Sequence, residues 1–297
     1  YGADAVRIGM LLCASAGNDI FYDESQVEQG RNFCGKIWNS YRLVKGWSVD
    51  ADAKQPEECA IAVEWFKNKL NQTIETVEDH YSKFRISDAL MSIYKLFWDD
   101  YCSWYLELIK PAYGQPVDKV TYTETLGFFE ALLKMIHPVM PFITEELWQD
   151  MAERKEGETI MFQSTPKAEA YDAAFISSFE LAEEAVNAVR SIRQQKNISP
   201  KEALQIKFKG EFPAEMIAVV SKLANASSVE LVSDFGATSE GVSMMVRTVE
   251  MYVPLTGKVN VDEEIAKLEA ELKYQREFLE SVRKKLSNER FTAHAPE

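Results

Sequence analysis

The sequence has few of the residues that build metal and redox sites, and it has no long hydrophobic run. Its four cysteines and three histidines are scattered, and no two cysteines show the C-x-x-C spacing that is typical of zinc sites. No apolar run approaches the ~20 residues that a membrane-spanning helix requires. We therefore expect no bound metal and no membrane association, and we interpret the cysteines as reduced residues of a cytoplasmic protein.

The common catalytic motifs are also missing. The sequence has no G-x-G-x-x-G loop, no complete G-x-x-x-x-G-K-[ST] loop, and no G-x-S-x-G or H-E-x-x-H motif. Asp99 and Asp100 are adjacent, so on a helix their side chains point about 100° apart and cannot form an acid–base pair. His137 precedes Pro138 at a predicted helix end, where a structural role is favoured. The residues alone therefore indicate no active site and disfavour a free-standing enzyme.

The charge is strongly acidic overall but locally basic. A net charge of −14 argues against a protein that binds nucleic acid through its whole surface. However, residues 26–47 contain four basic residues and one acidic residue, and residues 187–209 contain six basic residues and one acidic residue. Residues 273–290 contain six basic and three acidic residues. This distribution permits contact with nucleic acid without specifying it.

Residues 87–110 are predicted to form one long helix around which the fold is organised. Ser87 is placed to act as the N-cap, and Pro111 follows the last helical residue, Lys110. Two apolar rows run along the helix, where a surface helix needs only one. They comprise Leu90, Phe97, Tyr101, Trp104 and Leu108 in one row, and Tyr94, Trp98, Cys102, Tyr105 and Ile109 in the other. The pattern predicts the central member of an α-helical bundle.

Periodicity and turn residues predict the remaining elements. The expected helices are 1–15, 25–47, 57–84, 122–136, 178–195 and 213–224, together with one that begins at Thr144. Helix 1–15 is expected to have Val6, Met10 and Leu11 on its apolar face. Ser25 is expected to cap helix 25–47, and Thr144 to cap the helix that it begins. The expected strands are 160–163, 203–209, 228–232 and a β-rich run at 243–253. A heptad spacing predicts a coiled-coil helix through Ile265, Leu268, Leu272, Gln275, Leu279, Val282 and Leu286. The fold class is therefore mainly α: a helical bundle, a small α+β module and a C-terminal coiled-coil helix.

The polar side of helix 25–47 is the best candidate for a binding surface. Its apolar residues share the opposite side, namely Val27, Phe33, Ile37, Tyr41 and Val44. The polar strip comprises Arg31, Asn32, Lys36, Asn39 and Arg42. Lys and Arg suit phosphates, whereas Asn can pair with the edges of unpaired RNA bases. Phe33 could stack on a base, although its apolar neighbours favour core packing.

Several long segments resemble a known family. The segments YGADAVRIGMLL, GRNFCGKIWNSYRLV, FWDDYCSWYLELIKP and HPVMPFITEELW, in this order, resemble the C-terminal part of class I aminoacyl-tRNA synthetases for large aliphatic amino acids. The segments RSIRQQKNISPKEAL and KKLSNERFTAHAPE are similar to those of valyl-tRNA synthetases. An isoleucyl-type fragment is the nearest alternative, but that family commonly ends in a cysteine-rich zinc module, which this sequence lacks.

The resemblance implies a division into four parts. Residues 1–24 are similar to the end of the catalytic region, 25–196 to an anticodon-binding helical bundle, 197–258 to an α+β connector, and 259–297 to the first helix of a C-terminal coiled-coil arm. The resemblance also implies that the chain is truncated at both ends. We therefore expect this fragment to be inactive alone and to hold no cofactor, with ATP and Mg²⁺ bound by the catalytic domain that it lacks.

The resemblance implies a valine-specific tRNA as the partner, rather than DNA, and a monomeric protein. Three groups of residues are expected to contact tRNA: Arg31, Asn32, Phe33, Lys36, Asn39 and Arg42 at the anticodon; Arg190, Arg193 and Lys196 in the second basic segment; and Arg283, Lys284, Lys285 and Arg290 at the elbow. An alternative from a different class of function is a helical protein–protein scaffold that dimerises through its coiled coil. Artificial pairing through a truncated coiled coil also stays open.

Overall fold

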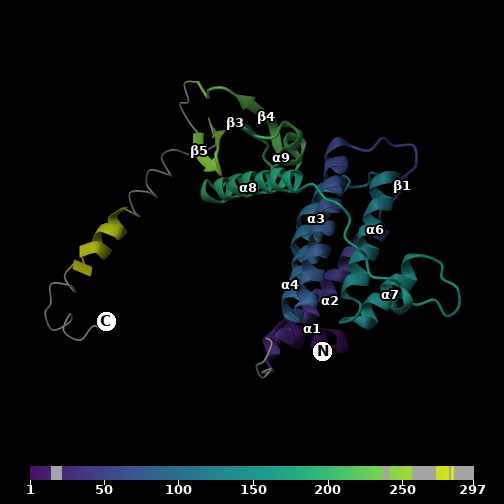
Figure 1. Ribbon diagram of the computed structural model, residues 1–297. Helices are drawn as coiled ribbons and strands as arrows, with labels where there is room; N and C mark the ends of the chain where they lie inside the picture. Colours follow the sequence, from purple (N-terminus) through teal and green to yellow (C-terminus); the bar gives the residue numbers. More distant parts are fainter. Residues whose placement is uncertain (15–21, 237–240, 256–271, 281, 284–297) are drawn as a thin grey trace, which may run out of the picture.

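The protein is mainly helical, with a small sheet near its C-terminal end (Figure 1). The computed structural model describes residues 1–14, 22–236, 241–255, 272–280 and 282–283. Helices α1 to α7 form a bundle, and α8 lies beside α3, roughly perpendicular to it, under a four-stranded sheet (Figure 1). This arrangement confirms the predicted fold class for its bundle and its α+β module. The predicted boundaries at 24, 196 and 258 stay predictions.

The central helix is continuous, but its middle is wider than an α-helix. It comprises α4 (Ile86–Lys95), the π-helical segment η1 (Leu96–Tyr105) and α5 (Leu106–Ile109). The hydroxyl of Ser103 donates to the carbonyl of Trp98, five residues earlier. Burial on two sides is confirmed, whereas Ser87 is not the N-cap because the helix already begins at Ile86.

Aromatic side chains of the neighbouring helices fill the core around this helix. The surrounding helices are α2 (Glu24–Lys45), α3 (Glu57–Ser82) and α6 (Lys119–Ile136). The ring of Phe66 on α3 lies 5.1–5.3 Å from the rings of Tyr101, Tyr105 and Phe128. Such tilted pairs add to the free energy gained by burying large apolar surfaces. The core is thus built on the rows predicted for the central helix.

Helix α1 (Ala3–Leu12) packs against α2 with almost no side chain between the backbones. A Cβ atom added at Gly30 would overlap the carbonyl oxygen of Ala5, and one added at Gly9 would lie 2.6 Å from the carbonyl oxygen of Gln26. Glycine is required at both positions because only hydrogen fits there. The predicted apolar face of α1 is only partly right: Leu11 packs against the core, but Met10 is exposed and the fully buried residue is Ile8.

Two predicted helix caps are wrong by a few positions. Asp23, and not Ser25, caps α2 by accepting a hydrogen bond from the Ser25 amide at 2.9 Å. Helix α7 (Pro141–Met151) begins before Thr144, whose hydroxyl is fully buried and donates to the carbonyl of Met140. Asp4 of α1 satisfies the first turn of α7 instead, accepting from the Ile143 amide at 2.7 Å. Proline favours a helix start, and here its signal outweighs that of the later threonine.

The C-terminal module has one crossover and one hairpin. Its elements are α8 (Ala173–Gln195), β3 (Leu204–Lys209), η3 (Ala214–Met216), α9 (Ile217–Leu223), β4 (Ala226–Val232), β5 (Gly241–Val246) and β6 (Val249–Pro254). The strand order is β4-β3-β6-β5, with β3 and β4 parallel and the other pairs antiparallel. Leu204, Ile206 and Phe208 alternate inward and are fully buried, as the sequence predicted.

Two smaller segments complete the fold. Two-residue strands β1 (Val49–Asp50) and β2 (Val117–Asp118) pair in parallel and join two loops of the bundle. The strand predicted at 160–163 is wrong, because Ile160–Phe162 forms a 3₁₀ turn, η2. Residues 272–280 are helical and include the predicted heptad positions Leu272, Gln275 and Leu279, whereas Ile265, Leu268 and Leu286 lie outside the described residues.

Candidate nucleic-acid interface

The polar residues of α2 form a ridge on an otherwise buried helix. We call Arg31, Asn32, Lys36, Asn39 and Arg42 the α2 ridge. Four of them are exposed and Lys36 is half-buried, whereas the five predicted apolar residues on the opposite side are all buried. The 3.6-residue period of the helix separates the two sets. The prediction that this helix is amphipathic is therefore confirmed; a role of the ridge in binding stays a prediction.

Most side chains of the ridge are available for a ligand. Asn32, Asn39 and Arg42 make no side-chain hydrogen bond or ion pair with any residue in the described part of the chain. Arg31 pairs with Glu28 at 2.8 Å, but both side chains are more than half exposed, at 56% and 54%. An ion pair this exposed is weak and exchanges readily with another anion. The ridge thus presents two guanidinium groups and two amides to solvent.

Lys36 lies against a pair of stacked aromatic rings beside the ridge. Its ammonium is 5.3 Å from the ring centroid of Trp98, and Trp98 stacks with Tyr94 at 5.6 Å and 14°. Both aromatic residues are half-buried. Both were predicted to lie in the core, and their i, i+4 spacing on the row that faces α2 is the signal that could have linked them to the ridge.

Phe33 does not belong to this surface. Its ring is fully buried beneath the aromatic pair, with its centroid 4.7 Å from that of Tyr94 and 6.3 Å from that of Trp98. This burial confirms the core packing that its apolar neighbours favoured, and it leaves no exposed ring face on which a base could stack. Two exposed apolar side chains that sequence reasoning passed over, Trp38 and Leu43, flank the ridge at 41% and 39% exposure.

The second predicted basic group is divided by the structure. Arg193 is only 7% exposed, and its guanidinium donates to the carbonyls of Ser199, Ala224 and Asn225. Burial lowers the pKa of this guanidinium, which nevertheless keeps three acceptors. Arg193 therefore fastens α8 to the sheet module and is not available to tRNA. Arg190 is exposed and lies 5.0 Å from the ring of Trp104, and Lys196 is half-buried.

The third predicted group is described only at its first residue. Arg283 is exposed at the end of the short helical stretch that follows residue 272. Lys284, Lys285 and Arg290 lie outside the described residues. A binding role for this group remains a prediction.

A partial phosphate-loop pattern inside α2 has a structural explanation. Residues 30–36 fit G-x-x-x-x-G-K, but Ile37 follows where Ser or Thr would hold Mg²⁺. The whole segment is helical, so its amides are not free to surround a phosphate. Gly30 is explained by the close approach to α1. The pattern is therefore coincidental.

The described residues contain neither a membrane-spanning helix nor a group of metal-ligating side chains. None of their helices is both long and apolar enough to cross a membrane. No three His, Cys, Asp or Glu side chains in the described ranges are placed to share a metal ion. Burial raises the pKa of the Cys34 and Cys59 thiols to about 11 and of the Cys102 thiol to about 12, so all three stay protonated near neutral pH.

Comparison with known proteins places the chain in a family. A model of the anticodon-binding domain of tRNA ligase matches residues 63–208, and a model of the valyl tRNA synthetase tRNA binding arm matches residues 260–297. Valine–tRNA ligases of Parabacteroides distasonis and Phocaeicola vulgatus are each 54% identical to this chain over its whole length. The chain belongs to the valine–tRNA ligase family. The resemblance inferred from the sequence is therefore confirmed, and the isoleucyl-type and scaffold alternatives are not favoured.

The match has a defined extent within the family. The chain spans about a third of its relatives, 34% of the Parabacteroides protein and 35% of the valine–tRNA ligase of Fusobacterium nucleatum, which is 33% identical. A solved LeuRS–tRNA complex of Agrobacterium radiobacter aligns with this chain at 18% sequence identity. The alignment covers 58% of this chain and 20% of the solved chain. Its TM-score of 0.39 is too low to support any conclusion about the site. The anticodon-binding match begins in α3 and ends in β3, so the α2 ridge precedes it.

Proposed function

We propose that this chain supplies tRNA-binding surfaces to a valine–tRNA ligase, and that the α2 ridge contacts the anticodon stem-loop of a valine-specific tRNA. The observation that carries this proposal is the exposed ridge on a helix whose other side is sealed in the core. Membership of the family supports tRNA as the partner. The bundle would thus serve as a rigid mount for a small set of recognition side chains.

The side chains of the ridge suit different parts of an RNA hairpin. Arg31 and Arg42 would contact phosphates, and Asn32 and Asn39 would pair with base edges. Lys36 would leave Trp98 for a phosphate, because a partly exposed cation–π contact is worth only about 1 kcal/mol. This exchange would uncover the indole ring beside the amides. The ridge would then combine charge, hydrogen bonding and an aromatic surface.

The chemistry of such a ligase would reside elsewhere in the polypeptide. We propose that valine is activated with ATP and Mg²⁺ and transferred to tRNA by the part of the ligase that this chain does not span. This chain would bind no cofactor and would show no aminoacylation activity by itself. Its match to only 34% of the Parabacteroides relative, the part that includes the anticodon-binding and arm regions, supports that division.

A binding titration tests the role of the ridge. The chain is titrated with valine tRNA carrying either its own or an altered anticodon, as wild type and as the Lys36→Ala/Asn39→Ala variant. We expect the variant to bind at least tenfold more weakly and to distinguish the two anticodons less well, because one base contact is worth about 1–3 kcal/mol.

The control for this titration is Lys54→Ala/Gln163→Ala, which removes an exposed lysine and an exposed amide away from the ridge. Its affinity should match that of the wild type. Equal affinity and equal anticodon discrimination for wild type and the Lys36→Ala/Asn39→Ala variant would exclude the ridge. We also propose that the protein is a cytoplasmic monomer; a tight dimer in light scattering would instead support the scaffold alternative.

A further inference from the structure

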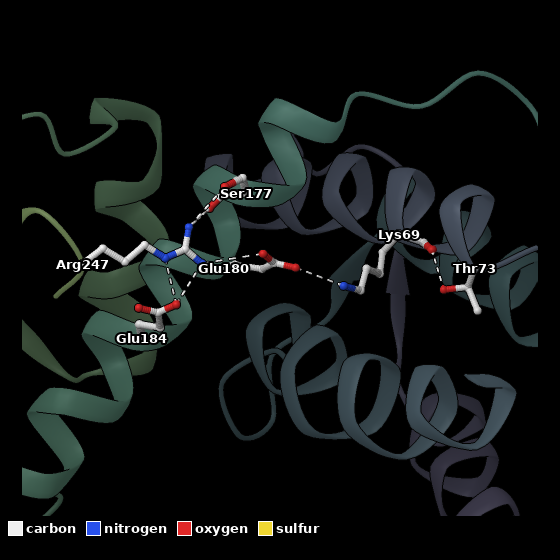
Figure 2. Close-up of polar contacts among 6 residues, drawn as sticks. All are labelled: Lys69, Thr73, Ser177, Glu180, Glu184 and Arg247. Carbon is white, nitrogen blue, oxygen red and sulfur yellow. Dashed lines mark hydrogen bonds and ion pairs between the residues drawn. The ribbon is translucent and has the colours of Figure 1, made fainter. Parts of the chain in front are cut away.

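Arg247 occupies an unusual place at the tip of the β5–β6 hairpin. Its backbone has φ of 52°, in the left-handed region that tight hairpin turns require. Its guanidinium reaches α8, where Nε donates to Glu184 at 2.9 Å and Nη1 donates to the carbonyl and the hydroxyl of Ser177 (Figure 2). Nη2 also lies 3.6 Å from the carboxylate of Glu180. One side chain thus holds the hairpin against more than one turn of α8.

The same contacts continue from α8 into the bundle. Glu180 lies between Arg247 and Lys69 of α3, and the ammonium of Lys69 is 3.2 Å from the second carboxylate oxygen of Glu180 (Figure 2). One residue earlier on α8, Phe179 stacks on Trp65 of α3 with centroids 3.9 Å apart at 11°. The hairpin is therefore connected to α3 through one turn of α8. Because the ring stack is fully buried, that turn is fixed to the bundle.

The β5–β6 hairpin precedes the part of the chain that matches the tRNA binding arm. Strand β6 ends at Pro254, and the match to the tRNA binding arm begins at residue 260. The chain therefore leaves the described part of the module at the end of β6 and continues into the part that matches the arm.

We propose that Arg247 is a positioning residue for tRNA binding: by fastening the β5–β6 hairpin to α8, it holds β6, from whose end the chain continues toward the arm region, in a fixed place relative to the α2 ridge. The inference rests on the proposed function, since it supposes that one tRNA meets both surfaces. Two surfaces on one rigid body bind with a high effective concentration, and this advantage falls when their separation is no longer fixed. Each ion pair at Arg247 is partly exposed and weak alone, but the guanidinium is held by two carboxylates, a carbonyl and a hydroxyl.

A pair of substitutions distinguishes positioning from direct contact with tRNA. Arg247→Gln and Glu184→Gln break the same network from opposite sides. If Arg247 acts by position, both variants should weaken valine tRNA binding by a similar factor of about three to ten. If Arg247 instead contacted a phosphate, Glu184→Gln would leave binding unchanged or strengthen it, because it removes a negative charge. The double variant should be no weaker than the single ones.

The salt dependence and a matched control sharpen this test. Removing a basic residue that contacts a phosphate lowers the slope of log affinity against log salt by about one unit, whereas a positioning residue can be removed without changing the slope. Glu211→Gln, on an exposed part of the same module, is the charge-matched control for Glu184→Gln and should bind as the wild type does. Arg247→Lys should restore part of the affinity, since it retains the charge.

A distance measurement without tRNA keeps the inference independent of the proposed function. Fluorophores at exposed positions Glu78 on α3 and Ser233 after β4 report the separation of bundle and module by energy transfer. We expect a broader distance distribution in Arg247→Gln and in Glu184→Gln than in the wild type. Unchanged distributions, or unchanged tRNA affinity in a chain whose wild type binds, would overturn the inference. Failure of the wild type to bind tRNA would instead count against the proposed function.

Discussion

At the residue scale, two glycines of α2 have opposite roles. Gly30 lies where α2 touches α1, and any side chain there would collide with the carbonyl of Ala5. Gly35 lies on the exposed side, where an added Cβ would meet nothing within 4 Å. The sequence alone does not separate them, because both interrupt the helix in the same way. Only the neighbouring helix decides which one is required.

These two positions give a matched pair of stability predictions. Gly30→Ala should lower the free energy of unfolding by about 1–3 kcal/mol, because helix α1 must move away. Gly35→Ala should raise it by about 0.5–1 kcal/mol, because alanine loses less backbone entropy in a helix. Urea denaturation of both variants measures the difference. Similar stabilities for the two variants would mean that the helices do not approach each other as closely as the structure indicates.

At the element scale, Glu183 of α8 and Asp100 of the central helix are close enough to affect each other's ionisation. Burial raises the pKa of Glu183 to about 8, with a further contribution from Asp100, and it raises the pKa of Asp100 to about 6. One carboxylate oxygen of Glu183 is buried without a hydrogen-bond partner among the described residues. Lys69 opposes both shifts, whereas Glu180 adds to them. The contact between these elements therefore favours a protonated Glu183.

This pair predicts a loss of stability at alkaline pH. The folded-state pKa of Glu183 lies above its unfolded value of 4.5, so its stabilising contribution is complete below about pH 4.5 and is lost as the pH rises through about 8. Between pH 5 and pH 9 the loss should amount to roughly 4 kcal/mol. Glu183→Gln should flatten this part of the pH profile in urea denaturation, while Glu211→Gln should not. Parallel profiles for wild type and Glu183→Gln would contradict the prediction.

The sequence predicted most helices and strands but not the details that depend on neighbours. The apolar rows of the central helix were sufficient because burial on two sides follows directly from its pattern. The π-helical turns of η1 were not predicted, since they change the spacing of contacts without changing the residue types. The caps at Ser25 and Thr144 failed because Asp23 and Pro141 offer earlier helix starts. For the candidate interface, exposure of the α2 ridge was predictable, whereas burial of Arg193 depends on other elements.

At the scale of the whole molecule, an acidic protein with a net charge of −14 is proposed to bind a polyanion. Binding then depends on a few local basic groups, and each phosphate contact releases counterions. The tRNA affinity should therefore fall steeply with salt concentration. The slope of that dependence indicates how many basic residues contact phosphates.

The salt dependence gives a prediction for the C-terminal basic group. Replacing Arg283, Lys284, Lys285 and Arg290 by Gln should reduce the slope of log affinity against log salt by about one unit for each of these residues that touches a phosphate. The control replaces four exposed lysines of the bundle, with the same change in net charge: Lys54, Lys67, Lys119 and Lys155. A slope that changes equally in both variants would indicate a general charge effect, and an unaltered slope would exclude phosphate contacts by this group.

The close seam between α1 and α2 has a mechanical consequence. Gly30 is the immediate neighbour of Arg31, so the backbone that carries the first ridge residue rests directly on α1. Helix α1 in turn holds the start of α7 through Asp4. No layer of side chains separates the backbones at Gly30 to absorb a displacement there. A force exerted on the ridge by a bound RNA hairpin would therefore displace α2, α1 and α7 together, because no compressible side-chain layer separates α2 from α1.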